Sequence, residues 1–181
     1  MSKHTQTESA GFSPAIAAAM AEFQDDISRM GIIVVAHPKG VMPGGRWGSY
    51  DHASRTVHLV ANLAPIQARS VLAHELAHAK HGHVGQQECQ EREAEATAAR
   101  ALIGDVEHLK AAAQGLNLIG TLAVGLGVLP RDIRRYIEAN PWESAKAIME
   151  AMTTPKAFDR PKPSDYRREN YPMRADLIAS S

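Results

Sequence analysis

The stretch "VLAHELAHAKHGH" spans residues 71–83 and holds four histidines and one glutamate. It belongs to an alanine-rich segment without glycine before Gly82, so we predict one helix from Pro65 to about His81. Residues four positions apart lie on the same face of a helix, which directs the His74 and His78 side chains the same way. Glu75 lies about 100° further round the helix. The helix therefore places two imidazoles on one face with a carboxylate beside them, and the search for a function begins with these three side chains.

The five residues from His74 to His78 fit the HExxH arrangement that is typical of zinc peptidases. A catalytic Zn²⁺ takes three protein ligands and leaves one position for water. Glu75 is the predicted general base, which takes a proton from the water and passes it to the leaving amine. The alternative is a chance match in a histidine-rich helix, so the rest of the chain must supply a third ligand.

A second predicted helix, over residues 86–104, is rich in glutamate and alanine. Residues 91–95, Glu-Arg-Glu-Ala-Glu, fit the ExxAD-like pattern in which a glutamate of the next helix is the third ligand, so Glu91 is the predicted third zinc ligand. Gly82 and Gly85 lie between the two helices and let the chain turn back and pack them antiparallel. Glu88 and Glu95 share a helix face with Glu91, so either could be the ligand instead. If Glu91 is the ligand, Glu95 lies one turn further on and could accept a hydrogen bond from a ligand histidine.

The remaining patterns predict an α+β fold that is mostly helical, with a small antiparallel-containing sheet packed on the HExxH helix. A β-branched run and a hairpin supply three strands, near 32–38, 46–50 and 56–60. Further helices are expected over 14–30, 105–113, 116–125, 130–139 and 143–152. We expect four parts: a disordered N-terminus (1–12), a metallopeptidase core (13–114), a C-terminal helical, helix-turn-helix-like subdomain (115–152) and an extended or disordered tail (153–181).

The segments "RWGSYDH" (46–52), "ARSVLAHELAHAKHGH" (68–83) and "EREAEATAA" (91–99) resemble the ImmA/IrrE family of zinc metallopeptidases. "LGVLPRDIRRYIE" (126–138) resembles the C-terminal segment of actinobacterial and phage members. The resemblance implies a minimal gluzincin-like fold with an edge strand along the cleft, to which a substrate strand can add. It also implies the cleavage of helix-turn-helix transcriptional repressors of mobile elements, phages or stress genes. One departure is Glu95, where the family usually has Asp or Asn.

Attack on a peptide carbonyl needs a donor for the developing oxyanion. Tyr50 is the first candidate and His52 the second, because both lie on or near the predicted hairpin; the alternative for each is ordinary sheet packing. We interpret His81 and His83 as the polar end of the helix rather than as metal ligands.

Lysine plus arginine equals aspartate plus glutamate, at twenty each, so the overall charge does not favour nucleic acid or an anionic membrane as a partner. Cys89 is the single cysteine, and the polar N-terminus is unlike a signal peptide, so we expect a cytoplasmic protein. Two other functions stay open: a non-cleaving, zinc-stabilised protein that captures a regulator, and a DNA-binding regulator that uses the arginines of the C-terminal helices.

Overall fold

The computed structural model describes residues 12–42, 45–85, 87–106, 109 and 119–153. Apart from Phe12 and Thr153, the N-terminal segment and the tail that were predicted to be disordered lie outside these residues. Most of the helix predicted over 105–113 also lies outside them.

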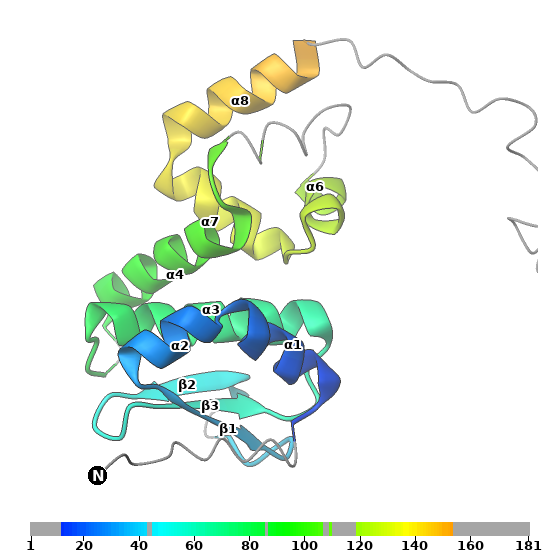
Figure 1. Cartoon of the computed structure of the whole chain (residues 1–181). Coiled ribbons are helices and arrows are strands. Elements are labelled where there is room, and N and C mark those ends of the chain that lie inside the picture. Colours follow the sequence, from blue (N-terminus) through cyan, green and yellow to red (C-terminus); the bar gives the residue numbers. More distant parts are fainter. Residues whose placement is uncertain (1–11, 43–44, 86, 107–108, 110–118, 154–181) are drawn as a thin grey trace, which may run out of the picture.

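The fold is α+β and mostly helical, as predicted, with a sheet on one side of a central helix and further helices on the other (Figure 1). From the N-terminus the elements are α1 (Pro14–Glu22), α2 (Gln24–Met30), β1 (Ile33–His37), β2 (Gly48–Asp51), β3 (Thr56–Val60), α3 (Pro65–His81), α4 (Glu88–Ile103), α6 (Ile119–Leu126), α7 (Pro130–Ala139) and α8 (Pro141–Thr153). In the described part of the chain, no helix combines the length and the hydropathy that a membrane span requires.

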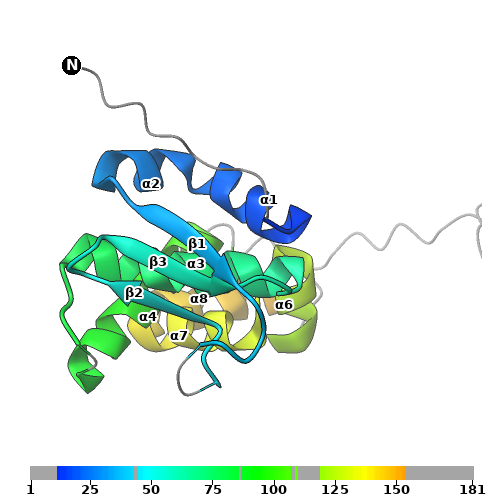
Figure 2. The same ribbon diagram turned by 90° about the horizontal axis from the view of Figure 1, so that it is seen from below.

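The three strands form a mixed sheet in the order β1-β3-β2 (Figure 2). The hairpin strands β2 and β3 pair antiparallel, with Tyr50 opposite Val57. Strand β1 joins the other side of β3 in parallel, with Val34 opposite Val57. Strand β2 is therefore an edge strand, and its free edge faces away from β3.

The single helix predicted over 14–30 is divided at Phe23 into α1 and α2. The hydrogen bonds from the Phe23 N–H to the Ala19 carbonyl and from the Ile27 N–H to the Phe23 carbonyl continue across the break. The break is thus a kink, which keeps Phe23 and Ile27 buried in the core.

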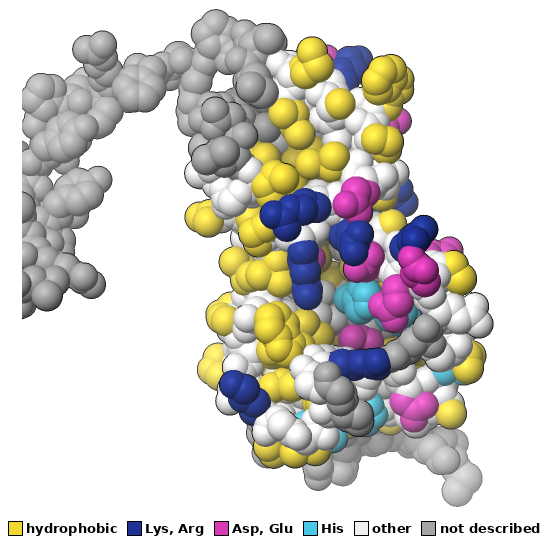
Figure 3. All heavy atoms as spheres, turned by 180° about the vertical axis from the view of Figure 1, so that it is seen from behind, with side chains coloured by type: hydrophobic (Ala, Val, Ile, Leu, Met, Phe, Trp, Pro, Cys, Tyr) yellow, Lys and Arg dark blue, Asp and Glu magenta, His cyan; other side chains and the backbone are white. Residues whose placement is uncertain are grey.

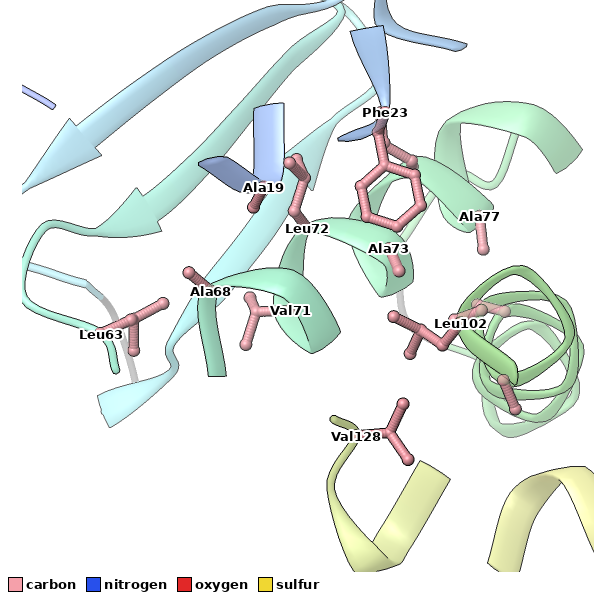
Figure 4. Packing of buried hydrophobic residues seen from close by; sticks show 14 of the residues in the cluster. Ala19, Phe23, Leu63, Ala68, Val71, Leu72, Ala73, Ala77, Leu102 and Val128 are labelled. Carbon is pink, nitrogen blue, oxygen red and sulfur yellow. The ribbon is translucent and has the colours of Figure 1, made fainter. Parts of the chain in front are cut away.

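Helix α3 lies at the centre of the core (Figure 4). Its buried face includes Ala68, Leu72 and Ala77, and small residues there let α1 and α4 approach closely. The helix begins with Pro65 at its first position and ends at Gly82, whose φ of 65° is the left-handed conformation that favours glycine.

The C-terminal helices pack on the side of α3 away from the sheet (Figure 1). Helix α7 packs along α4 and buries Ile133 and Tyr136. Arg69, on α3, links three segments of the chain. It forms an ion pair with Glu22 and donates hydrogen bonds to the carbonyls of Leu102 (3.1 Å) and Gly127 (3.0 Å).

Candidate active site

A cleft of about 670 Å³ runs between two walls that come from different parts of the chain. Strand β2 and helix α3 form one wall, and helices α4 and α7 form the other. Figure 3 shows histidine, acidic and basic side chains gathered on one face of the molecule, between two more apolar regions. Polar side chains that converge in a concave site are typical of an active site.

His74, His78 and Glu91 meet in this cleft, with their ligand atoms within 4.8 Å of one another. The two histidine Nε2 atoms are 3.1 Å apart. Glu91 Oε2 is 3.3 Å from His74 Nε2, and Glu91 Oε1 is 3.6 Å from His78 Nε2. Ligands at about 2.1 Å from a tetrahedral zinc ion are about 3.4 Å apart, so the separations in this structure fit such an ion.

Two helices produce this arrangement. The four-residue spacing on α3 stacks His74 over His78, as the sequence predicted, with their ring centroids 4.7 Å apart. Helix α4 runs back along α3 and brings in Glu91 from its first turn. The side chain of His78 is 8% exposed and that of His74 25%, so both rings are held in place largely by protein.

The pKa values of both histidines are lowered, which favours the neutral imidazole that a metal ion requires. Burial is the main cause of the fall to about 4 at His74, and His78 and Arg131 add to it, whereas Glu91 opposes it. The pKa of His78 is also lowered, again mainly by burial and less by His83 and His81, against Glu91.

Glu75 lies beside this group and is 7% exposed. Burial, and next the negative charge of Glu91, raise its pKa to about 8, while Arg46 and a backbone hydrogen bond from Tyr50 act in the opposite direction. A cation held by the three ligands would favour the carboxylate and lower this pKa towards neutrality, where a general base works best.

Strand β2 approaches α3 closely at Gly48. A Cβ atom at this position would lie 2.4 Å from Val71 Cγ1 and 3.0 Å from Glu75 Oε1. Only glycine lets the strand pass over Glu75 at this distance, and the strand then shields the carboxylate from solvent.

The other predicted site residues are placed as follows. Tyr50 lines the cleft, whereas the His52 ring lies near Gly82, at the C-terminal end of α3. The Glu95 carboxylate lines the cleft but pairs with Arg135, at 3.0 Å. Glu88, the rival ligand, is exposed and pairs with Arg92. The roles assigned to Tyr50, His52 and Glu95 stay predictions.

Sequence reasoning missed several residues of the cleft, and three of them carry ionisable side chains with contacts that matter here. His83, interpreted as part of a polar helix end, is 7% exposed and lines the site. Arg131 and Arg135 belong to the C-terminal helices whose arginines offered DNA binding as an alternative function, and both line the cleft wall formed by α7. Arg131 lies over the Trp47 ring, 5.8 Å from its centroid, and donates a hydrogen bond to Ser70. The tertiary packing of α7 decides these positions. For His83, the glycine before it was the available signal.

Comparison with known families gives one result. The family model described as the IrrE N-terminal-like domain, Peptidase_M78, matches residues 27–131, which is more than half of the chain. The matched range contains β2, α3 and α4 and ends at the start of α7. No curated protein and no solved structure matches the chain.

Proposed function

We propose that this chain, which belongs to the IrrE N-terminal-like family of metallopeptidases, Peptidase_M78, is a zinc-dependent endopeptidase that cleaves one specific intracellular protein. The observation that carries the proposal is the convergence of His74, His78 and Glu91 in a cleft that also holds the buried carboxylate of Glu75. A site that only stabilised the fold would have no use for a base next to its ligands.

In this proposal His74 Nε2, His78 Nε2 and one oxygen of Glu91 hold the zinc ion. Bound zinc supplies Lewis acidity, which makes water acidic near neutral pH and polarises the scissile carbonyl. Nitrogen and carboxylate donors in a three-residue set suit zinc, and the three separations agree with its tetrahedral geometry.

Glu75 moves the protons. Its carboxylate takes a proton from the attacking water as the new C–O bond forms, and gives the proton to the amide nitrogen as the C–N bond breaks. The products are a carboxylic acid and an amine, and Glu75 returns to its starting state. Tyr50 is the first candidate for a donor to the oxyanion, since it lines the cleft.

The substrate enters as an extended strand. Strand β2 is an edge strand, and Gly48, Ser49 and Tyr50 line the cleft, so main-chain hydrogen bonds to β2 would align a peptide along the site. The resemblance to the ImmA/IrrE family supports a helix-turn-helix transcriptional repressor of a mobile element, phage or stress response as this substrate.

The contacts of two arginines support a protein rather than DNA as the partner. Arg131 is engaged with Trp47 and Ser70, and Arg135 with Glu95, all within the molecule. Arginines held in this way contribute less to phosphate binding than free ones would.

The proposal is tested by incubating the zinc-loaded protein with a helix-turn-helix repressor of the same organism, taken from a neighbouring gene if one exists, and measuring intact masses. We expect a pair of fragments whose masses sum to that of the repressor plus one water, and no fragments with the Glu75→Gln variant. An intact repressor that co-purifies with both proteins would instead indicate the capturing function. A repressor that is neither cut nor bound would contradict the proposed substrate.

A further inference from the structure

His83 has no task in the mechanism above, although it is buried and directly contacts a proposed zinc ligand. Its Nδ1 atom is 3.0 Å from Nδ1 of His78, and its Nε2 atom is 3.1 Å from Oε2 of Glu93. The ring centroids of His78 and His83 are 5.1 Å apart. A continuous path of polar contacts thus runs from Glu93 through His83 to the side of His78 that faces away from His74 and Glu91.

The backbone fixes this contact. At the end of α3 the Gly82 N–H bonds to the Ala79 carbonyl (3.2 Å) and the His83 N–H bonds to the His78 carbonyl (3.0 Å). These two bonds, with Gly82 in the left-handed conformation, form a Schellman motif. In that motif the residue after the glycine folds back on the residue five positions before it, usually as an apolar pair. Here the pair is His83 and His78, so the helix end delivers an imidazole to the ligand.

Counting protons assigns the donors. Zinc on His78 Nε2 uses that atom's lone pair, so the proton of the neutral ring is on Nδ1. A donor at His78 Nδ1 needs an acceptor, and His83 Nδ1 is 3.0 Å away. Neutral His83 then has its proton on Nε2, which donates a hydrogen bond to the Glu93 carboxylate at 3.1 Å.

We propose that Glu93 and His83 form a hydrogen-bonded relay that holds His78 in the tautomer and orientation needed to bind zinc. The proposal rests on the proposed function, since it needs a metal at His78. Both residues are positioning residues: they act through His78 and do not touch the substrate. Partners of this kind raise the basicity of a ligand histidine and limit its rotation.

The same side chains suggest an alternative to the relay, namely a second metal site. His81, His83 and Glu93 could themselves hold a metal ion, with their ligand atoms within 4.8 Å of one another. The relay excludes this ion while the first site is filled, because the proton on His83 Nε2 occupies the lone pair that a metal would need. The chain should therefore bind one zinc ion, whereas the alternative requires two.

The test titrates the full-length, metal-stripped protein with Zn²⁺ against a chromophoric chelator of known affinity, which gives both affinity and stoichiometry. The variants are His83→Ala, His83→Asn and, as a matched control, His81→Ala. His81 also contacts Glu93, at 3.3 Å, and bonds to Thr97, but none of its hydrogen bonds in the described structure reaches His78. Circular dichroism and thermal melting of each metal-free variant report whether it is folded.

We expect one zinc ion per wild-type chain and an affinity about 10- to 100-fold weaker in His83→Ala. His81→Ala should bind like the wild type. His83→Asn should recover part of the loss, since its amide oxygen can accept a hydrogen bond from His78 Nδ1–H.

Equal affinities of folded His83→Ala and wild type would overturn the relay and leave the proposed function intact. Two zinc ions per wild-type chain, falling to one in His81→Ala, would overturn the relay in favour of the second metal site. A wild-type chain that binds no zinc would overturn the proposed function and the relay together. If His83→Ala does not fold, the comparison of His83→Asn with the wild type decides: a weaker zinc affinity of the Asn variant supports the relay, and an equal affinity overturns it.

Discussion

Two clusters of identical composition lie next to each other where α3 ends and α4 begins. His74, His78 and Glu91 form one, and His81, His83 and Glu93 form the other. The first opens into the cleft, beside Glu75 and under the edge strand β2. The second lies at the helix end: His83 reaches the cleft, but the Glu93 side chain is 55% exposed and His81 bonds to Thr97. A set of donors therefore does not define a catalytic site; an adjacent buried base and a strand for the substrate do.

The largest expected difference between the two clusters comes from replacing one carboxylate at each: Glu75, beside the first, and Glu93, within the second. Glu75→Gln should slow cleavage of the substrate by about 10²- to 10⁴-fold, because the attacking water loses its proton acceptor. Zinc binding should be retained. Glu93→Gln keeps an acceptor for His83 and should slow cleavage less than tenfold. The measurement is the initial rate of fragment formation, and similar losses in the two variants would show that Glu75 has no special role.

The next largest expected effect concerns the third zinc ligand. Glu91→Ala should weaken zinc binding by more than the roughly 100-fold that loss of an outer partner costs, since a direct ligand is gone. Glu88→Ala is the matched control on the same helix face, as Glu88 is exposed and pairs with Arg92. Chelator competition measures both, and the idea fails if the two alanine variants bind zinc equally well.

A pH dependence distinguishes the buried base from other carboxylates. The pKa of Glu75 is about 8 in the folded chain and 4.5 in its ordinary state, so between these pH values the folded chain holds a proton that the unfolded chain has lost. In EDTA the free energy of unfolding should therefore fall as pH rises from 4.5 to 8, by up to several kcal/mol from this group.

Glu75→Gln removes this contribution, so the variant should gain stability relative to the wild type as the pH rises through the same window. Denaturant titrations at several pH values measure it. A difference that does not change with pH would contradict the raised pKa.

The smallest predicted effect concerns the strand that covers the first cluster. Gly48→Ala places a methyl group against Val71 and Glu75, and overpacking of this kind costs about 1–3 kcal/mol. Gly120→Ala is the control: nothing lies within 4 Å of a Cβ there, and alanine in helix α6 should stabilise by about 0.5–1 kcal/mol. Thermal unfolding of both variants checks the opposite signs.

The parts that sequence predicted well depend on local rules. Pro65 and Gly82 indicated where α3 begins and ends. The four-residue spacing of His74 and His78 indicated that their imidazoles converge. The antiparallel return of α4 followed from the short connection and brought Glu91 to the same place.

The parts that sequence missed depend on reversal or docking of the chain. His83 follows the residue at which the helix ends, and the left-handed glycine turns its side chain inwards rather than to solvent. Arg131 and Arg135 reach the cleft only because α7 docks on α4, which no periodicity within α7 reveals. The parallel pairing of β1 with β3 is likewise a long-range contact.

Arg69 shows that a residue outside the cleft can also determine the position of a cleft wall. Its guanidinium holds Glu22, Leu102 and Gly127 at once, and so it fastens the turn before α7 to the ends of α1 and α4. A lysine would keep the charge but lack the planar fork that reaches three partners. The position of the α7 wall thus depends on a side chain that never lines the cleft. Laboratory evolution for altered substrate range should therefore randomise the surroundings of Arg69 together with the residues that face the peptide.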